Sequence, residues 1–95
     1  MTDPTYMRMG ASDDLSATDS ADSTAAAPDG TRVVRIAVLT ADVRIKIGVG
    51  VTATATDVLF PAGTVEYVAC RGGERVSAIR NASTNATVNV TFCDR

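Results

Sequence analysis

Histidine and tryptophan are absent from the sequence, and only two Phe and two Tyr supply aromatic rings among its 95 residues. Without histidine, the chain lacks both the commonest general base near neutral pH and the commonest metal ligand. No stretch approaches the roughly 18–20 consecutive apolar residues that span a bilayer, and the first residues lack the basic and apolar regions of a signal peptide. We therefore expect a soluble protein, made in the cytoplasm, with no membrane partner.

Groups that could support catalysis are few and scattered. The five carboxylates of residues 31–95 are isolated from one another, and the Asp13-Asp14 pair lies in a segment too loose to hold an active-site geometry. Neither a Gly-rich phosphate loop nor a Cys-x-x-Cys pair occurs. The arginines lack the interleaved aromatic residues or recognition helix typical of nucleic-acid binding. These observations predict a non-enzymatic protein that binds no cofactor, metal or nucleic acid.

The two cysteines, Cys70 and Cys93, form the one pair with potential chemistry. The expected strand alternation places both on the outer side of the domain. A disulfide requires their Cα atoms to lie within about 7 Å, which the sequence does not determine. In a reducing cytosol the default is a pair of free thiols. We expect two free surface thiols, with a disulfide as the alternative.

Residues 1–30 differ in charge and texture from the rest. They carry six Asp against one Arg, a net charge of −5, whereas residues 31–95 carry eight basic against five acidic residues, a net charge of +3. Between Gly10 and Gly30 the only large apolar residue is Leu15. Such a composition buries too little surface to offset the entropy of ordering. We predict a flexible acidic arm over residues 1–30 and a β domain over residues 31–95.

The arm also holds the candidate partner-binding residues. An apolar cluster near its start could anchor in a groove of a neighbouring chain, and Leu15 adds one further apolar side chain. The candidate residues are Tyr6, Met7, Arg8, Met9 and Leu15. An acidic arm on a mildly basic body can bind a basic partner surface or a neighbouring copy.

From residue 31 onward, apolar and polar residues alternate with period two, which is typical of half-buried strands. The turn signals Pro61-Ala62-Gly63 and Gly72-Gly73 separate such segments, and Thr40-Ala41 could join a hairpin. We predict an all-β fold of six to seven short strands, a small antiparallel β-sandwich or barrel with an extended N-terminal arm. The predicted core comprises Val34, Ile36, Val43, Ile45, Ile47, Val65, Tyr67, Ile79, Val88, Val90 and Phe92.

Three segments between Arg44 and Phe92 carry a family resemblance. They are VTATATDVLFPAGTVEYVAC, RGGERVSAIR and ATVNVTF: a Thr/Ala strand, a Leu-Phe-Pro-Ala-Gly turn, a Val-Glu-Tyr strand, a glycine turn and a closing Val-x-Val-Thr strand. This succession resembles a family of small structural proteins of tailed-bacteriophage virions. It covers roughly half of the chain, while the acidic arm and the cysteine pair depart from the family pattern.

The resemblance implies a structural, non-enzymatic virion protein. The expected role is a capsid decoration or cement protein on the capsid exterior, made in the host bacterial cytoplasm and binding the major capsid protein through its β domain and arm. Homo-oligomers or many copies per particle are expected. The alternative is a head-fibre, connector or tail-associated module, whose loops at 48–56 and 81–86 would contact other virion proteins or the host surface.

Overall fold

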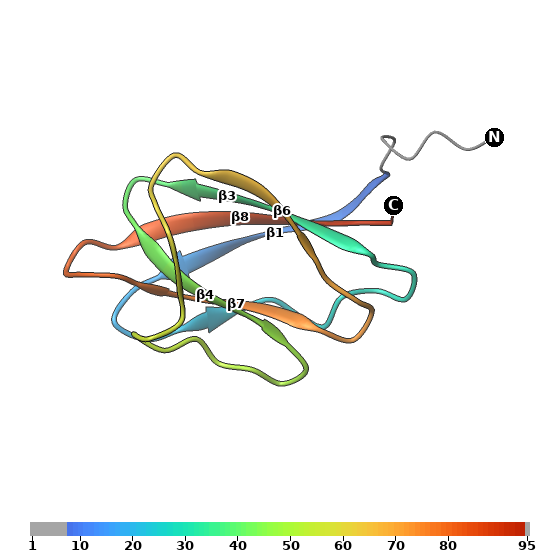
Figure 1. Cartoon of the computed structure of the whole chain (residues 1–95), viewed down its shortest axis with the longest axis horizontal. Coiled ribbons are helices and arrows are strands. Elements are labelled where there is room, and N and C mark those ends of the chain that lie inside the picture. The colour runs from blue at the N-terminus through green and yellow to red at the C-terminus, as the bar shows by residue number, and fades with distance from the viewer. Residues whose placement is uncertain (1–7, 95) are drawn as a thin grey trace.

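In the computed structural model, which describes residues 8–94, two antiparallel four-stranded sheets pack face to face as a sandwich (Figure 1). The first sheet has the order β1-β8-β3-β6 and the second the order β2-β7-β4-β5. Among the described residues, no helix is long and apolar enough to cross a membrane. The strands are β1 (Met9–Ala17), β2 (Asp22–Ser23), β3 (Val33–Leu39), β4 (Val43–Gly48), β5 (Val58–Phe60), β6 (Val65–Ala69), β7 (Arg75–Arg80) and β8 (Ala86–Cys93).

The all-β antiparallel sandwich is thus confirmed, and its two sheets do not close into a barrel. The described residues form eight strands, where six or seven were predicted. Both additional strands, β1 and β2, come from the segment predicted to be an arm. β1 begins and β8 ends at the same end of the sandwich, and they run side by side (Figure 1).

The prediction of a flexible arm is therefore wrong for much of residues 1–30. β1 pairs with β8, with Leu15 opposite Val88 and Ala17 opposite Ala86. Leu15 and Ala17 are buried in the core. The composition argument failed because β1 needs few apolar residues of its own: it adds to an existing sheet, where β8 supplies its backbone hydrogen-bond partners.

The core agrees with the prediction over β3, β4 and β8. The predicted residues Val34, Ile36, Val43, Ile45, Val88, Val90 and Phe92 are buried, and Ile47 packs against them. Val65 and Tyr67 were misplaced: they are 52% and 48% exposed. In the register of β6, Tyr67 lies opposite Arg35, so its side chain shares the outer face. With apolar residues on both faces of a five-residue strand, the alternation did not determine which face turns inward.

The same one-residue error affects β7. Val76 and Ala78 are buried in the core, whereas Ile79 is only partly buried. Register explains the difference, because Ala78 lies opposite the inward residue Ile45 and Ile79 lies opposite Arg44. Successive residues of a strand alternate between faces, so Ile79 lies on the outer face.

β3 and β4 do not form the predicted hairpin. They belong to different sheets, so Thr40 and Ala41 carry the chain across the sandwich. Thr40 has a φ of 75°, a left-handed conformation that is rare for a β-branched residue. A hairpin turn would keep both strands in one sheet, whereas this crossing stacks Val43 of β4 in the same core as Val38 of β3.

Candidate interaction surfaces

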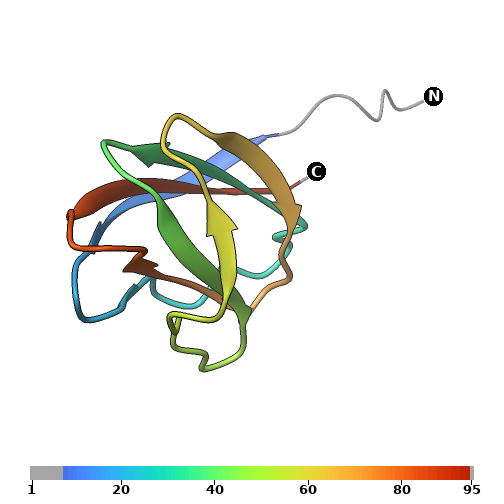
Figure 2. The same ribbon diagram turned by 60° about the vertical axis from the view of Figure 1, so that its left-hand side comes forward.

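One lateral side of the sandwich exposes apolar side chains on the edge strands β5 and β6. We call it the β5–β6 side and define it by Val58, Leu59, Phe60, Val65, Tyr67 and Val68. Val58 is 66% exposed and Leu59 40%. In Figure 2 β5 (yellow) and β6 (gold) come to the front of the molecule. The sandwich therefore presents apolar surface along both strands.

Between these two edges lies an apolar groove of about 250 Å³. It is lined by Ile45, Ile47, Val58, Phe60 and Val68. β5 pairs only with β4 and β6 only with β3, so each closes its own sheet without meeting the other. The groove thus lies where the two sheets are not joined to each other, and exposed apolar patches mark interaction sites.

The free edge of β6 also presents backbone hydrogen-bonding groups. The amide of Cys70 donates to the carbonyl of Arg32 at 3.1 Å, and the amide of Val38 donates to the carbonyl of Thr64 at 2.9 Å. Even-numbered residues around β6 therefore bond to β3. Because backbone groups alternate in direction along an antiparallel strand, the N–H and C=O groups of Val65, Tyr67 and Ala69 point away from β3.

The opposite lateral side is acidic. We call it the β1–β2 side and define it by Asp13, Asp14, Asp19 and Asp22. The first three are exposed, and Asp22 is half-buried; its carboxylate accepts from the amides of Ser16 at 2.9 Å and Ser23 at 3.0 Å. The bond from Ser16 joins β1 to β2 at the edge of the sandwich. The arrangement of carboxylates on one side gives a negatively charged surface.

A polar network continues from Asp14 across the outer face of the first sheet. The Asn89 amide donates to the Asp14 carboxylate at 2.8 Å and to the Ser12 hydroxyl at 3.1 Å. Arg35 donates to the Asn89 carbonyl oxygen at 3.5 Å. The network links β1, β8 and β3, so Asp14 is held in position by its neighbours, whereas Asp13 is not part of it.

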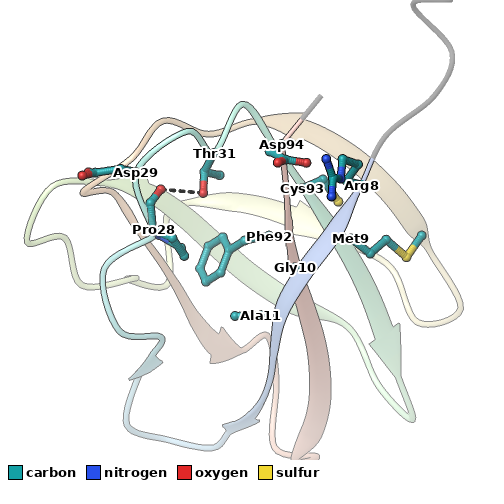
Figure 3. A pocket seen from close by; sticks show the side chains of 10 residues that line it. All are labelled: Arg8, Met9, Gly10, Ala11, Pro28, Asp29, Thr31, Phe92, Cys93 and Asp94. Atoms are coloured by element: carbon teal, nitrogen blue, oxygen red, sulfur yellow. Dashed lines mark hydrogen bonds between the residues drawn. The ribbon is translucent and has the colours of Figure 1, made fainter.

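A shallow hollow of about 270 Å³ lies at the end of the sandwich where β1 begins and β8 ends (Figure 3). Pro28 and Phe92 form part of its wall, and the Thr31 hydroxyl donates to the Pro28 carbonyl at 2.7 Å. Its charged residues are Arg8, Asp29 and Asp94. Within residues 8–94, no three potential metal-ligating side chains come together, here or elsewhere.

The cysteines lie on opposite faces of the first sheet, and neither is at the surface. Cys70 belongs to the core, whereas Cys93 lies opposite Val33 on the outer face. The predicted face was therefore right for Cys93 and wrong for Cys70, and the predicted exposure was wrong for both, since each is buried. β3 runs between their strands, which places their Cα atoms roughly 9–10 Å apart, beyond the reach of a disulfide. Both are free thiols.

Burial governs the chemistry of both thiols. It raises the pKa of the Cys70 thiol to about 11, and the Glu74 carboxylate adds to the rise. Burial also raises the pKa of Cys93, although the nearby Arg35 opposes the rise. A thiol with a raised pKa stays protonated at neutral pH, and the protonated form is a poor nucleophile and a poor metal ligand.

Of the predicted anchor residues that the structure describes, Leu15 lies apart from Arg8 and Met9. Leu15 is buried in the core, so it is structural and is not a partner-binding residue. Met9 is 63% exposed at the start of β1, and Arg8 lies beside Asp94, whose amide donates to the Arg8 carbonyl at 3.0 Å. Tyr6 and Met7 lie outside the described residues.

The two loops proposed as receptor contacts are both anchored to the second sheet. In the first, the buried Ala53 amide donates to the Ser77 hydroxyl at 2.9 Å, and Asp57 caps the turn by accepting from the Thr54 amide at 2.7 Å. In the second, Asn81 accepts from the Arg44 guanidinium at 2.9 Å. These bonds fix the loops rather than leave them free to adapt.

The β5–β6 side was missed by sequence reasoning because Val65 and Tyr67 were assigned to the core. The sequence did contain a signal for this surface: β6 has apolar residues on both of its faces, and only one face of an edge strand can be buried in the core. Comparison of the chain with protein-family models, with curated proteins and with solved structures found no match.

Proposed function

We propose that this protein is a structural, non-enzymatic component of a tailed-bacteriophage particle, acting as a decoration or cement subunit on the capsid exterior. In this role the acidic β1–β2 side contacts the major capsid protein, and the apolar β5–β6 side contacts a neighbouring subunit. The proposal begins from the resemblance of the segment between Arg44 and Phe92 to small virion proteins.

The observation that carries the proposal is the separation of two chemically different surfaces on opposite sides of one sandwich. The β1–β2 side offers carboxylates such as Asp13 and Asp19, whereas the β5–β6 side offers exposed Val58, Val65 and Tyr67. A subunit that cements a shell has to bind two different neighbours at once. Two separate surfaces of unlike chemistry suit that task, because each can recognise its partner without competing with the other.

The charge difference also suggests how binding should respond to salt. Exposed carboxylates attract a basic partner surface through interactions that are screened over about 10 Å at 0.1 M salt. Apolar contacts lack this screening. If both surfaces are engaged in the particle, attachment should weaken partway as salt rises and then level off.

The first test is the copy number of the protein in purified particles, measured by mass spectrometry against the major capsid protein. A decoration role predicts hundreds of copies per particle. A dozen or fewer would overturn that role in favour of the connector, head-fibre or tail alternative. Absence from particles would overturn the virion proposal as a whole.

The second test addresses the acidic side. The double variant Asp13→Asn and Asp19→Asn should bind undecorated capsids more weakly than the parent at low salt and equally at high salt. A matched control is Asp29→Asn, which removes an exposed carboxylate at the end of the sandwich. Co-sedimentation measures the binding. Equal loss in the double variant and the control would show that overall charge, and not the β1–β2 side, determines attachment.

A further inference from the structure

The edge of β6 differs from the other three sheet edges in the described residues. β2 and β5 are short, with two and three residues. β1 is long, but its register shifts between Met9 and Ser12, and the exposed Asp13, opposite Val90, puts a carboxylate on this edge strand. Bulges, short length and inward charges are features by which proteins prevent edge-to-edge pairing. β6 is longer than β2 and β5 and has no register shift; its one charge, Glu66, lies opposite the buried Ile36.

We propose that β6 pairs antiparallel with β6 of a second copy of this chain, around a two-fold axis centred on Tyr67. The N–H and C=O groups of Val65, Tyr67 and Ala69 point to this edge, as the bonds of the intervening residues to β3 require. A two-fold pairing centred on Tyr67 sets Tyr67 opposite Tyr67 of the second copy and Val65 opposite Ala69. All three positions then form hydrogen-bonded pairs, which join the two sheets into one of eight strands.

The charges on this side fit a second copy. Glu66 is the one charged residue within β5 and β6. In the register centred on Tyr67, Glu66 lies opposite Val68 of the second copy. Moving the centre to Glu66 would oppose two like charges, which is destabilising in a strand pair. The register centred on Tyr67 therefore avoids like charges, and it sets apolar side chains against apolar side chains on the outer face.

The apolar groove beside β6 adds to the contact. A five-residue strand pair alone falls short of the roughly 1,000 Å² typical of a specific interface. The exposed Val58 and the partly buried Phe60 and Val68 border the same edge, so a second copy would cover part of the groove. We expect a weak dimer that forms with rising concentration. The pairing rests on the proposed function, since it names the neighbour of the β5–β6 side as a second copy of this chain, and it is tested on the free protein.

Sedimentation velocity of the full-length chain tests the inference. The weight-average mass should rise from one to two chains with concentration. Tyr67→Asp should hold it at one chain at every concentration, with an unchanged melting temperature. Val49→Asp is the matched control: Val49 is 78% exposed and lies outside β6, so this variant should dimerise like the parent. A monomeric parent at its highest soluble concentration overturns the inference, and so does a dimer that survives Tyr67→Asp.

A cross-link tests the register. Directly opposed residues in a hydrogen-bonded antiparallel pair have Cα atoms about 5.5 Å apart, within the range that a disulfide bridges. Tyr67→Cys should therefore give a covalent dimer on mild oxidation, whereas Val49→Cys should not. Equal cross-linking of the two variants overturns the register. A parent that is monomeric but still binds capsids through the β1–β2 side would overturn self-pairing while leaving capsid attachment standing.

Discussion

The exposed strand edges on the two lateral sides of this sandwich carry side chains of different chemistry. At the β1–β2 side, a shifted register and the carboxylates of Asp13 and Asp14 accompany the long strand β1. At the β5–β6 side, Val58, Val65 and Tyr67 stand exposed beside an apolar groove. Charged side chains keep the β1–β2 edge in contact with water, whereas the apolar side chains of the β5–β6 edge suit it to association. The consequence is that β1 should matter for stability and β6 for assembly.

The largest effect should come from removing β1. Deleting residues 1–17 takes Leu15 and Ala17 out of the core and leaves one edge of β8 unpaired. We expect a chain that no longer folds, because a small domain is stable by only about 5–15 kcal/mol. Circular dichroism should show loss of the cooperative melting transition. Deleting residues 1–7 is the control, which retains β1 and should keep that transition. If the chain that lacks residues 1–17 still folds, β1 is a dispensable arm and is not required for stability.

A single substitution on each side should change the free energy of unfolding by different amounts. Leu15→Ala should lower the free energy of unfolding by about 2–5 kcal/mol, since Leu15 is 1% exposed and its truncation leaves a cavity. Tyr67→Ser should change the free energy of the monomer by no more than about 0.5 kcal/mol, as is usual for an exposed position. Urea denaturation at low protein concentration measures both. Similar losses in both variants would break the division into a structural and an associating side.

Cys70 offers a smaller effect with a characteristic pH dependence. Its pKa in the folded state is about 11, above the ordinary value of 9.0, so folding favours the protonated thiol. The unfolded chain releases this proton first, and the thiol's contribution to stability is therefore complete below pH 9 and is lost as the pH rises toward 11. Cys70→Ala should show a shallower alkaline decline than the parent. Parallel stability curves between pH 8 and 11 would contradict the assignment.

The smallest effect on stability should come from the exposed carboxylate of Asp13 at the β1 edge. Asp13→Val should leave the free energy of unfolding within about 0.5 kcal/mol of the parent, because Asp13 is exposed. It should nevertheless increase self-association, since an apolar edge strand invites pairing. Sedimentation of this variant in a Tyr67→Asp background isolates the β1 edge. Unchanged monomers would mean that the shifted register alone keeps that edge unpaired.

Thiol labelling sharpens the comparison by reporting local opening. Cys93 lies opposite Met9 in the β1–β8 pair, whereas Cys70 directly follows β6. Leu15→Ala, which weakens β1, should therefore speed maleimide labelling of Cys93 more than that of Cys70. Peptide mass spectrometry separates the two rates. Equal acceleration would indicate that the domain opens as one unit.

The sequence by itself determined the all-β class and most of the core, because β3, β4 and β8 alternate clearly between apolar and polar residues. Val34, Ile36 and Val90 were placed correctly from that alternation. The sequence also indicated the turn at Pro61-Ala62-Gly63, where Gly63 has a φ of 84°. These features depend on neighbouring residues, so a local pattern suffices to predict them.

The tertiary structure decided the features that depend on distant partners. Leu15 is buried because β8, more than 70 positions away, supplies both a pairing edge and a core, and the composition of residues 1–30 contains no trace of that partner. Tyr67 is exposed because its register with Arg35 fixes the face of β6, whose own residues are apolar on both faces. The physical reason is the same in both cases: strand pairing is non-local, and one residue of register exchanges the buried and exposed faces.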